Sequence, residues 1–332
     1  MKAPELAERL RSGDRAAVAR ALNLADDRRP TARAETLALL DLLEREASFP
    51  GPPRVGVTGA PGAGKSTLLD ALVRALRRRG ETVAVVAVDP SSQRTGGALL
   101  GDRVRMRSGG GDEGVFIRST AARGQLGGIS ESAWSAVAIL AAAFDRVFVE
   151  TVGVGQSEGE VAALVDTLLF VANPGGGDTL QFMKAGILEL PDVFAVNKAD
   201  LGPPAERAAR ELEAALRLGE REGSGERWEP PVRLVSARDG TGIEPLLEAL
   251  DAHRAFGTAH GALAERRRRG RERFLLESLS RRYGSYGVEK IGGAAGVLAA
   301  LEADNGESPA AALARLSRAI EAALAGSAGP GR

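Results

Sequence analysis

Hydrophobic positions in residues 1–48 recur at helical spacing, with leucine, valine and alanine three or four positions apart. The tripeptide RPT at 29–31 interrupts this pattern, because a proline ends a helix that precedes it. The pattern therefore predicts two helices, with Thr31 as the N-terminal cap of the second. The segment FPGPP at 49–53 predicts a rigid linker into the rest of the chain.

From residue 54 onward, short apolar runs alternate with helical stretches. Near-continuous apolar runs separated by helices are typical of a mostly parallel sheet that is buried on both faces. Strands are predicted at 54–59, 82–89, 114–119, 146–150, 167–173, 192–197 and 232–236. Helices are predicted at 65–79, 130–143, 203–221 and from Pro245 to the end, and charged pairs such as Glu206 and Arg210 indicate that 203–221 has a solvated face. The expected fold class is α/β.

Composition limits the function classes. The chain has 332 residues, 44 basic and 44 acidic side chains and no net charge, whereas nucleic-acid binding favours a basic domain. The longest apolar run, 133–144, is shorter than the roughly 20 residues of a membrane span. The N-terminus has no apolar segment typical of a signal peptide. We therefore predict a cytoplasmic protein that binds neither nucleic acid nor membrane, and we interpret the basic run 266–274 as a solvated helix face.

A phosphate-binding motif follows the first predicted strand. The sequence GAPGAGKST at 59–67 fits G-x-x-x-x-G-K-[ST], and a predicted helix comes directly after it. Such a loop turns backbone N–H groups toward phosphate oxygens, and the helix N-terminus adds partial positive charge. Lys65 is predicted to reach the β- and γ-phosphates, and Ser66 to bind Mg²⁺. The predicted phosphate-binding residues are Gly59, Gly62, Ala63, Gly64, Lys65, Ser66 and Thr67.

A second motif, NKAD at 197–200, ends a later predicted strand. A carboxylate at Asp200 accepts hydrogen bonds from N1–H and the 2-amino group of guanine, and adenine has no donor at either place. Lys198 is expected to lie over the base, and Asn197 to tie this loop to the phosphate-binding loop. The dipeptide Ser236-Ala237 ends the last predicted strand and completes the predicted base site. The sequence therefore predicts GTP and GDP as ligands.

Three acids, Asp89, Asp102 and Glu150, lie at or after predicted strand ends. Because Mg²⁺ takes few protein ligands and keeps water and phosphate oxygens, we expect these acids and Ser66 to surround one ion, some of them through water. The stretch VFVETVGVGQSE at 147–158 is unusual, because Glu150 stands where a nucleotide hydrolase usually has Asp. Val154 stands where Ras-like enzymes have the glutamine that orients water.

Four longer motifs occur in order: DPSS…GGALLGDRVRM, RSTAARGQLGG, ETVGVGQSE and NPGGGDTLQFMKAGILE. Over about residues 54–245 they resemble the MeaB/ArgK family, GTPase chaperones of adenosylcobalamin-dependent methylmalonyl-CoA mutase. The segment NGESPAAALARL at 305–316 also resembles the C-terminal end of that family.

The resemblance implies a P-loop domain of the SIMIBI class between an N-terminal helical extension and a C-terminal helical dimerisation region. We place these domains at 51–255, 1–50 and 256–332. It also implies a homodimer, an adenosylcobalamin-dependent acyl-CoA mutase as partner, and cobalamin bound by that mutase rather than by this chain. Segment 175–187 resembles a third switch that engages the mutase. The residues expected in catalysis are Lys65, Asp89, Glu150 and Lys184, the last supporting partner-stimulated hydrolysis.

Three other functions fit parts of the sequence. A metal-delivery GTPase of the HypB/UreG type would need soft or imidazole ligands near the nucleotide. This chain has no cysteine, and its two histidines, His253 and His260, are expected to lie outside the nucleotide domain. A kinase acting on a transport protein, an older description of ArgK-like chains, would need an acceptor site and a base. A GTP-binding module without enzymatic activity is the third alternative.

Overall fold

The computed structural model describes residues 2–89, 111–121, 131–151, 158–174, 189–218, 227–303 and 307–327. The chain packs into two compact units, each described here by itself. One comprises Pro52–Gly127 and Phe144–Arg266, and the other comprises Met1–Gly51, Gly128–Ala143 and Arg267–Arg332. These units are defined by packing alone, so the functional domains predicted at 1–50, 51–255 and 256–332 stay a prediction.

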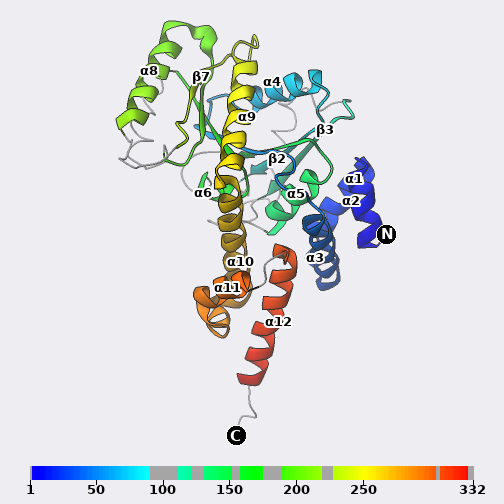
Figure 1. The fold of residues 1–332 in the computed structure, drawn as a ribbon. Coiled ribbons are helices and arrows are strands. Elements are labelled where there is room, and N and C mark those ends of the chain that lie inside the picture. Colours follow the sequence, from blue (N-terminus) through cyan, green and yellow to red (C-terminus); the bar gives the residue numbers. More distant parts are fainter. Residues whose placement is uncertain are drawn as a thin grey trace. The chain divides into compact units, whose positions relative to one another are not determined.

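The first unit is built on a seven-stranded sheet in the order β3-β2-β4-β1-β5-β6-β7 (Figure 1). All its strand pairs are parallel. The strands are β1 Arg54–Gly59, β2 Val83–Asp89, β3 Val115–Ala121, β4 Arg146–Thr151, β5 Thr167–Ala172, β6 Val193–Val196 and β7 Val232–Leu234. Phe148, Phe170 and Phe194 on the inner strands are almost completely buried. The predicted α/β class with a parallel sheet is confirmed.

Helices cover both faces of this sheet. The elements are α4 Lys65–Arg78, α6 Glu158–Ala162, the 3-10 turn η3 Ala199–Leu201, α8 Pro203–Leu218, α9 Ile243–Ala259 and the start of α10 Ala262–Glu289. Helix α4 packs on β1 and β2, α9 packs on β5 and β6, and the two helices contact each other, so they share one face. A side chain at Gly56 would meet Val161 of α6, which places α6 on the other face. Helix α8 lies beside β7 at one edge (Figure 1).

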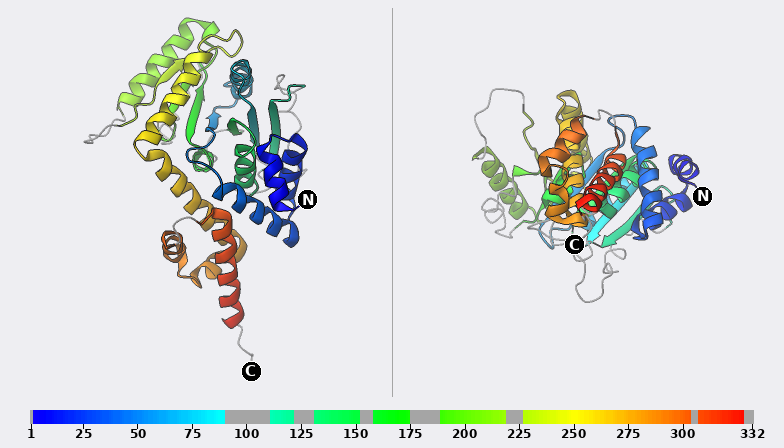
Figure 2. Two further views of the ribbon diagram at one scale, coloured as in Figure 1. Left: turned by 45° about the vertical axis from the view of Figure 1, so that its right-hand side comes forward. Right: turned by 90° about the horizontal axis from the view of Figure 1, so that it is seen from below.

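Three helices form at the N-terminus where the sequence analysis predicted two, and Figure 2 shows them grouped together. They are α1 Ala3–Arg11, α2 Arg15–Asp26 and α3 Pro30–Arg45. The missed break has a local cause, because Asp14 caps α2 by accepting from the N–H groups of Ala16 at 2.8 Å and Ala17 at 3.1 Å. The prediction of Thr31 as a cap was wrong. Pro30 is the first helical residue and Arg29 the cap position, because a proline there is already set for the helix.

The second unit brings distant parts of the sequence together. It contains α1–α3, α5 Glu131–Ala141, most of α10, α11 Gly293–Glu302 and α12 Pro309–Ser327. Trp134 of α5 stacks on Phe274 of α10 with ring centroids 4.6 Å apart, and its Nε1 donates to Glu44 of α3. Ser308, just before α12, donates to Asp41 of α3 at 2.6 Å. In the part of the chain that the structure describes, no helix has both the length and the apolar character of a membrane span.

The basic run 266–274 is not simply a solvated face, because its first residue makes a partly buried ion pair. Arg266 places Nη1 at 2.5 Å and Nη2 at 2.7 Å from the carboxylate of Asp192, just before β6. The same carboxylate accepts from the backbone N–H of Leu168 at 2.7 Å and lies 3.2 Å from Nε2 of His253. The pair fastens the start of α10 to the edge of the sheet where β5 and β6 begin.

The Asp192 cluster predicts a dependence of stability on acid. Burial by itself would raise the pKa of Asp192, but hydrogen bonds from His253 and Arg266 and the Arg266 charge outweigh it and hold the pKa below the ordinary 3.8. A carboxylate with a lowered folded pKa stabilises the fold above pH 3.8, and this contribution is lost as pH falls below that value. Asp192→Asn should cost about 3 kcal/mol at neutral pH.

Chemical denaturation of wild type and Asp192→Asn at several pH values would measure this difference. The difference in the free energy of unfolding between the two proteins should be constant around neutral pH and should decrease below pH 3.8. A difference that stayed the same down to the lowest pH at which both fold would show that the charge of Asp192 does not stabilise the fold.

Candidate nucleotide-binding site

Two glycines shape the loop between β1 and α4, because neither position has room for a side chain. Gly59 ends β1, and Gly64 occupies the N-cap position of α4 with a left-handed φ of 87°. The missing side chains matter at both places. A Cβ on Gly59 would lie 2.1 Å from the carbonyl oxygen of Val171, and one on Gly64 would lie 2.5 Å from Nδ2 of Asn197. Glycine is therefore required at both positions by close approach as well as by backbone conformation.

Lys65, the first residue of α4, spans the loop. Its ammonium donates to the carbonyl oxygens of Gly59 at 2.7 Å and Ala60 at 3.1 Å, and the side chain is buried. The positive charge therefore lies directly over the loop that the sequence motif identifies as phosphate-binding. A helix N-terminus with partial positive charge lies beside it, so the two features favour an anion at the same place.

Ser66 and Glu150 meet beside this loop. The hydroxyl of Ser66 donates to Oε1 of Glu150 at 2.7 Å, although the two residues are 84 positions apart in sequence. Glu150 is the fifth residue of β4 and only 3% exposed. The prediction that Ser66 and Glu150 gather at one place therefore agrees with the geometry. A hydroxyl and a carboxylate are hard oxygen donors of the kind that Mg²⁺ prefers, so these residues fit that ion.

Asn197 connects the second motif to the first. Its Nδ2 donates to the carbonyl oxygen of Ala63 at 2.9 Å, and its Oδ1 accepts from the backbone N–H of Ala237 at 3.2 Å. The side chain is buried at 2% exposure. One amide thus holds together the phosphate-binding loop, the end of β6 and the loop after β7, which is the tie that the sequence predicted.

Lys198 and Asp200 complete the cluster. Lys198 adopts a left-handed φ of 60° and donates from Nζ to the carbonyl oxygen of Gly62 at 3.0 Å. An L-residue in that conformation is strained and is often found at functional sites. Ser236 donates to Oδ1 of Asp200 at 2.9 Å, which fixes one oxygen of the carboxylate. Arg238 lies 3.9 Å from its other oxygen but is largely exposed, so we assign that ion pair little energy.

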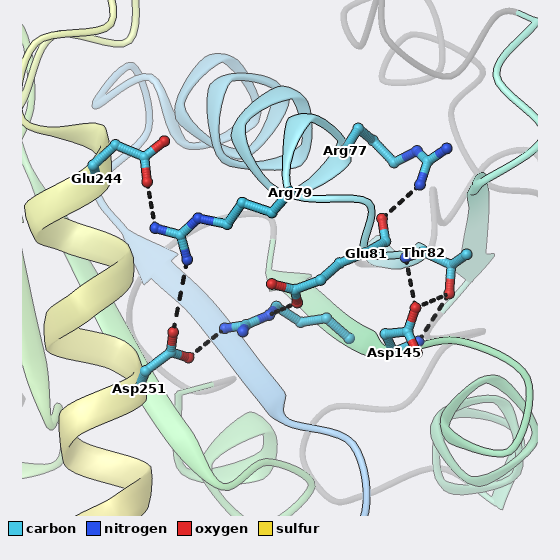
Figure 3. A network of polar contacts seen from close by, with 8 residues as sticks. Arg77, Arg79, Glu81, Thr82, Asp145, Glu244 and Asp251 are labelled. Carbon is cyan, nitrogen blue, oxygen red and sulfur yellow. Dashed lines mark hydrogen bonds and ion pairs between the residues drawn. The ribbon is translucent and has the colours of Figure 1, made fainter.

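An ionic network at the opposite edge of the sheet holds the other end of α4, and sequence analysis did not predict it (Figure 3). Arg79 pairs with Glu244 and lies 4.0 Å from Asp251, both on α9. The buried Arg146 at the start of β4 donates to Asp251 at 2.8 Å and to Glu81 at 3.1 Å. Helix α4 is therefore fixed at both ends, by the phosphate-binding loop and by this network.

Several predicted site residues lie outside what the structure describes. Asp89 ends β2, which places its backbone at the same edge of the sheet as Glu150, but its side chain is not described. Asp102, residues 152–157 with Val154, and segment 175–187 with Lys184 are not among the described residues. Their predicted roles stay predictions.

The expectation that both histidines lie outside the nucleotide unit was wrong, because that unit contains His260 as well as His253. His253 packs inside that unit, with Nδ1 2.8 Å from the hydroxyl of Thr167 and Nε2 3.2 Å from Asp192. Thr167 begins β5 and Asp192 precedes β6, whereas the phosphate-binding loop follows the end of β1. In a parallel sheet all strands start on one side and end on the opposite side, so His253 lies away from the nucleotide site.

A parallel sheet with a phosphate-binding loop after its first strand, tied to an NKAD loop by Asn197, defines a P-loop GTPase. The comparison with protein families agrees. Residues 18–283 match the model described as methylmalonyl Co-A mutase-associated GTPase MeaB, and the chain belongs to this family.

Relatives and a solved structure support the assignment. A protein of Pyrococcus horikoshii that carries a GTPase name is 45% identical over 266 residues, which cover 80% of this chain and 81% of that protein. The mouse methylmalonic aciduria type A homolog, a mitochondrial protein, is 38% identical over 77% of this chain and 64% of its own length. The crystal structure of a LAO/AO transport system kinase covers 96% of this chain and 97% of its own, with TM-score 0.69 and 31% identity. The chain is a hydrolase acting on GTP.

Proposed function

We propose that this GTPase acts as a chaperone of an adenosylcobalamin-dependent acyl-CoA mutase such as methylmalonyl-CoA mutase, and that GTP hydrolysis gates cofactor loading and protection of the mutase. The observation that carries the proposal is the match of residues 18–283 to a family described by its association with that mutase. The mouse relative, named for methylmalonic aciduria, supports it. A homodimer, a cytoplasmic location and cobalamin bound by the mutase complete the proposal.

The residues of this chain suit the first part of the proposed function, which is the binding of GTP and Mg²⁺. Lys65 and the N–H groups of the loop bind the phosphates, while Asp200, fixed by Ser236, selects the base. Bound Mg²⁺ would neutralise charge on the β- and γ-phosphates. Ser66 and Glu150 would hold this ion, with Asp89 and Asp102 as further acids, some of them through water. Thr67 and Ala237 complete the nucleotide contacts.

The second half of the task is control by the partner. Position 154 holds valine, which cannot orient an attacking water as a glutamine does in Ras-like enzymes. We infer that intrinsic hydrolysis is slow, and that binding of the mutase raises it. Lys184 would then supply positive charge to the transition state, where charge develops on the transferred phosphoryl group.

Lys184→Ala tests this assignment. The variant should bind GTP and GDP with unchanged affinity, because nucleotide contacts come from other residues, and should lose most of the stimulation by the mutase. Binding by fluorescent nucleotide titration and turnover with saturating mutase would measure the two effects. A matched change at Lys290, which lies over the ring of Tyr286, should affect neither. Loss of nucleotide affinity in Lys184→Ala would contradict a role limited to partner stimulation.

The kinase alternative takes its support from the similarity to the solved structure of a LAO/AO transport system kinase. GTP labelled at the γ-phosphate separates the two activities, because a hydrolase releases the label as inorganic phosphate and a kinase transfers it to a protein. Metal delivery remains a weaker alternative, since His253 lies at the far edge of the sheet.

A further inference from the structure

Two buried threonine hydroxyls lie beside the start of the phosphate-binding loop. The sequence analysis assigned no role to either residue. Thr151 is 1% exposed and Thr58 is 0% exposed. The hydroxyl of Thr151 donates to Oγ1 of Thr58 at 3.2 Å and lies 3.4 Å from the carbonyl oxygen of Val57. Thr58 precedes the first glycine of the loop, and Thr151 follows Glu150 directly.

The hydroxyl pair connects β1 and β4 one position beyond the last residues at which their backbones are paired. The ladder between β1 and β4 ends with the pair of Val57 and Glu150. Beyond that point β4 remains paired to β2 through Thr151, and β1 remains paired to β5 through Gly59. The two strands therefore begin to separate at the residues that carry the phosphate-binding loop and the acid, and the hydroxyls connect them one position further.

Two contacts, one on each face of the sheet, thus hold the end of β4 where Glu150 lies. Side chains alternate along a strand, so Glu150 and Thr151 point to opposite faces. On one face Glu150 accepts from Ser66 of α4, and on the other Thr151 bonds to Thr58. If the end of β4 moved, the carboxylate would move relative to Ser66. Thr151 is also the last residue of β4 before segment 152–157.

We propose that Thr151, acting through Thr58, is a positioning residue for GTP hydrolysis. It holds the end of β4 so that the Glu150 carboxylate stays at the Ser66 hydroxyl, and it fixes the point from which segment 152–157 departs. The inference rests on the metal-side role proposed for Glu150. It does not depend on the mutase, because it concerns intrinsic hydrolysis.

Four full-length variants separate positioning from simple stability: Thr151→Val, Thr58→Val, the double variant and Thr151→Ser. Three measurements are made without mutase: the thermal midpoint, the affinity for fluorescent GDP with EDTA or with Mg²⁺, and single-turnover GTP hydrolysis. Thr151→Val should hydrolyse GTP about five-fold more slowly, which corresponds to about one net hydrogen bond. It should lose part of the Mg²⁺-dependent gain in GDP affinity, while binding in EDTA stays within about two-fold. Thr151→Ser should retain the wild-type rate.

The double variant is decisive. Replacing both partners of a buried hydrogen bond by apolar groups is nearly neutral for stability, whereas replacing one leaves the other without its partner. The double variant should therefore regain the thermal midpoint but keep the slow rate of Thr151→Val. A rate that recovers together with the midpoint, or a wild-type rate in Thr151→Val, would overturn the inference.

Glu150→Gln in the same assay shows which assignment has failed. If Glu150→Gln is slow and Thr151→Val is not, only the positioning role is wrong. If Glu150→Gln keeps the wild-type rate, the metal-side role of Glu150 fails, and the inference fails with it.

Discussion

Lys65→Ala should reduce GTP hydrolysis by about two to three orders of magnitude, the effect expected when a preorganised charge at the transferred phosphoryl group is removed. In the structure its ammonium is buried and bound to the carbonyl oxygens of Gly59 and Ala60, directly over the loop. No other lysine lies in the loop motif, so no neighbour in that stretch can replace its charge. Single-turnover phosphate release and nucleotide titration would measure the losses in rate and in affinity.

Lys290→Ala is the matched control, because it removes a lysine that follows the end of α10, outside the unit that holds the loop. It should leave the rate and the affinity for GTP unchanged. A Lys65→Ala protein that is folded and still hydrolyses GTP at the wild-type rate would show that the charge over the loop does not act on the phosphates.

Asp200→Asn should change base selectivity rather than abolish nucleotide binding. A carboxylate accepts two hydrogen bonds from guanine, whereas an amide offers one donor and one acceptor. The variant should therefore bind GDP about two orders of magnitude more weakly, since a buried donor is left facing a donor. The same amide matches xanthine, which has a carbonyl oxygen in place of the 2-amino group, so affinity for XDP should rise.

Competition between GDP, XDP and ADP for a fluorescent nucleotide would measure this change. Asp145→Asn is a suitable control, because Asp145 bonds to Thr82 at the opposite edge of the sheet (Figure 3). Unchanged preference for GDP over XDP in Asp200→Asn would mean that another group reads the base.

Much of the nucleotide unit follows from the sequence, for a physical reason. Strands buried on both faces must be apolar at nearly every position, so they stand out in the sequence as apolar runs. No predicted strand end is more than two residues from the observed one. The loop motif also determines its own geometry, because Gly59 and Gly64 leave no room for a side chain. The end-of-strand acid at Glu150 was placed beside Ser66 by the same logic, since parallel strands end at one edge.

The missed features depend on contacts between residues far apart in sequence. Arg266 and Asp192 are separated by 74 positions, and the sequence shows only one arginine in a basic run. Nothing in the apolar stretch at 131–141 indicates that Trp134 stacks on Phe274. The sequence does contain signals for the break between α1 and α2. Gly13, with a left-handed φ, suits the end of α1, and Asp14 caps the start of α2. The helical spacing continues across this break, so hydrophobic periodicity alone does not show it.

The rate of GTP hydrolysis with and without purified methylmalonyl-CoA mutase tests the central claim most directly. The account predicts slow turnover of the chain alone and a clear rise when the mutase is added at saturating concentration, because the partner completes a site that lacks a water-orienting glutamine at position 154. The Lys65→Ala variant gives the background. A turnover rate that is the same with and without mutase, in a protein that binds GTP, would contradict the account.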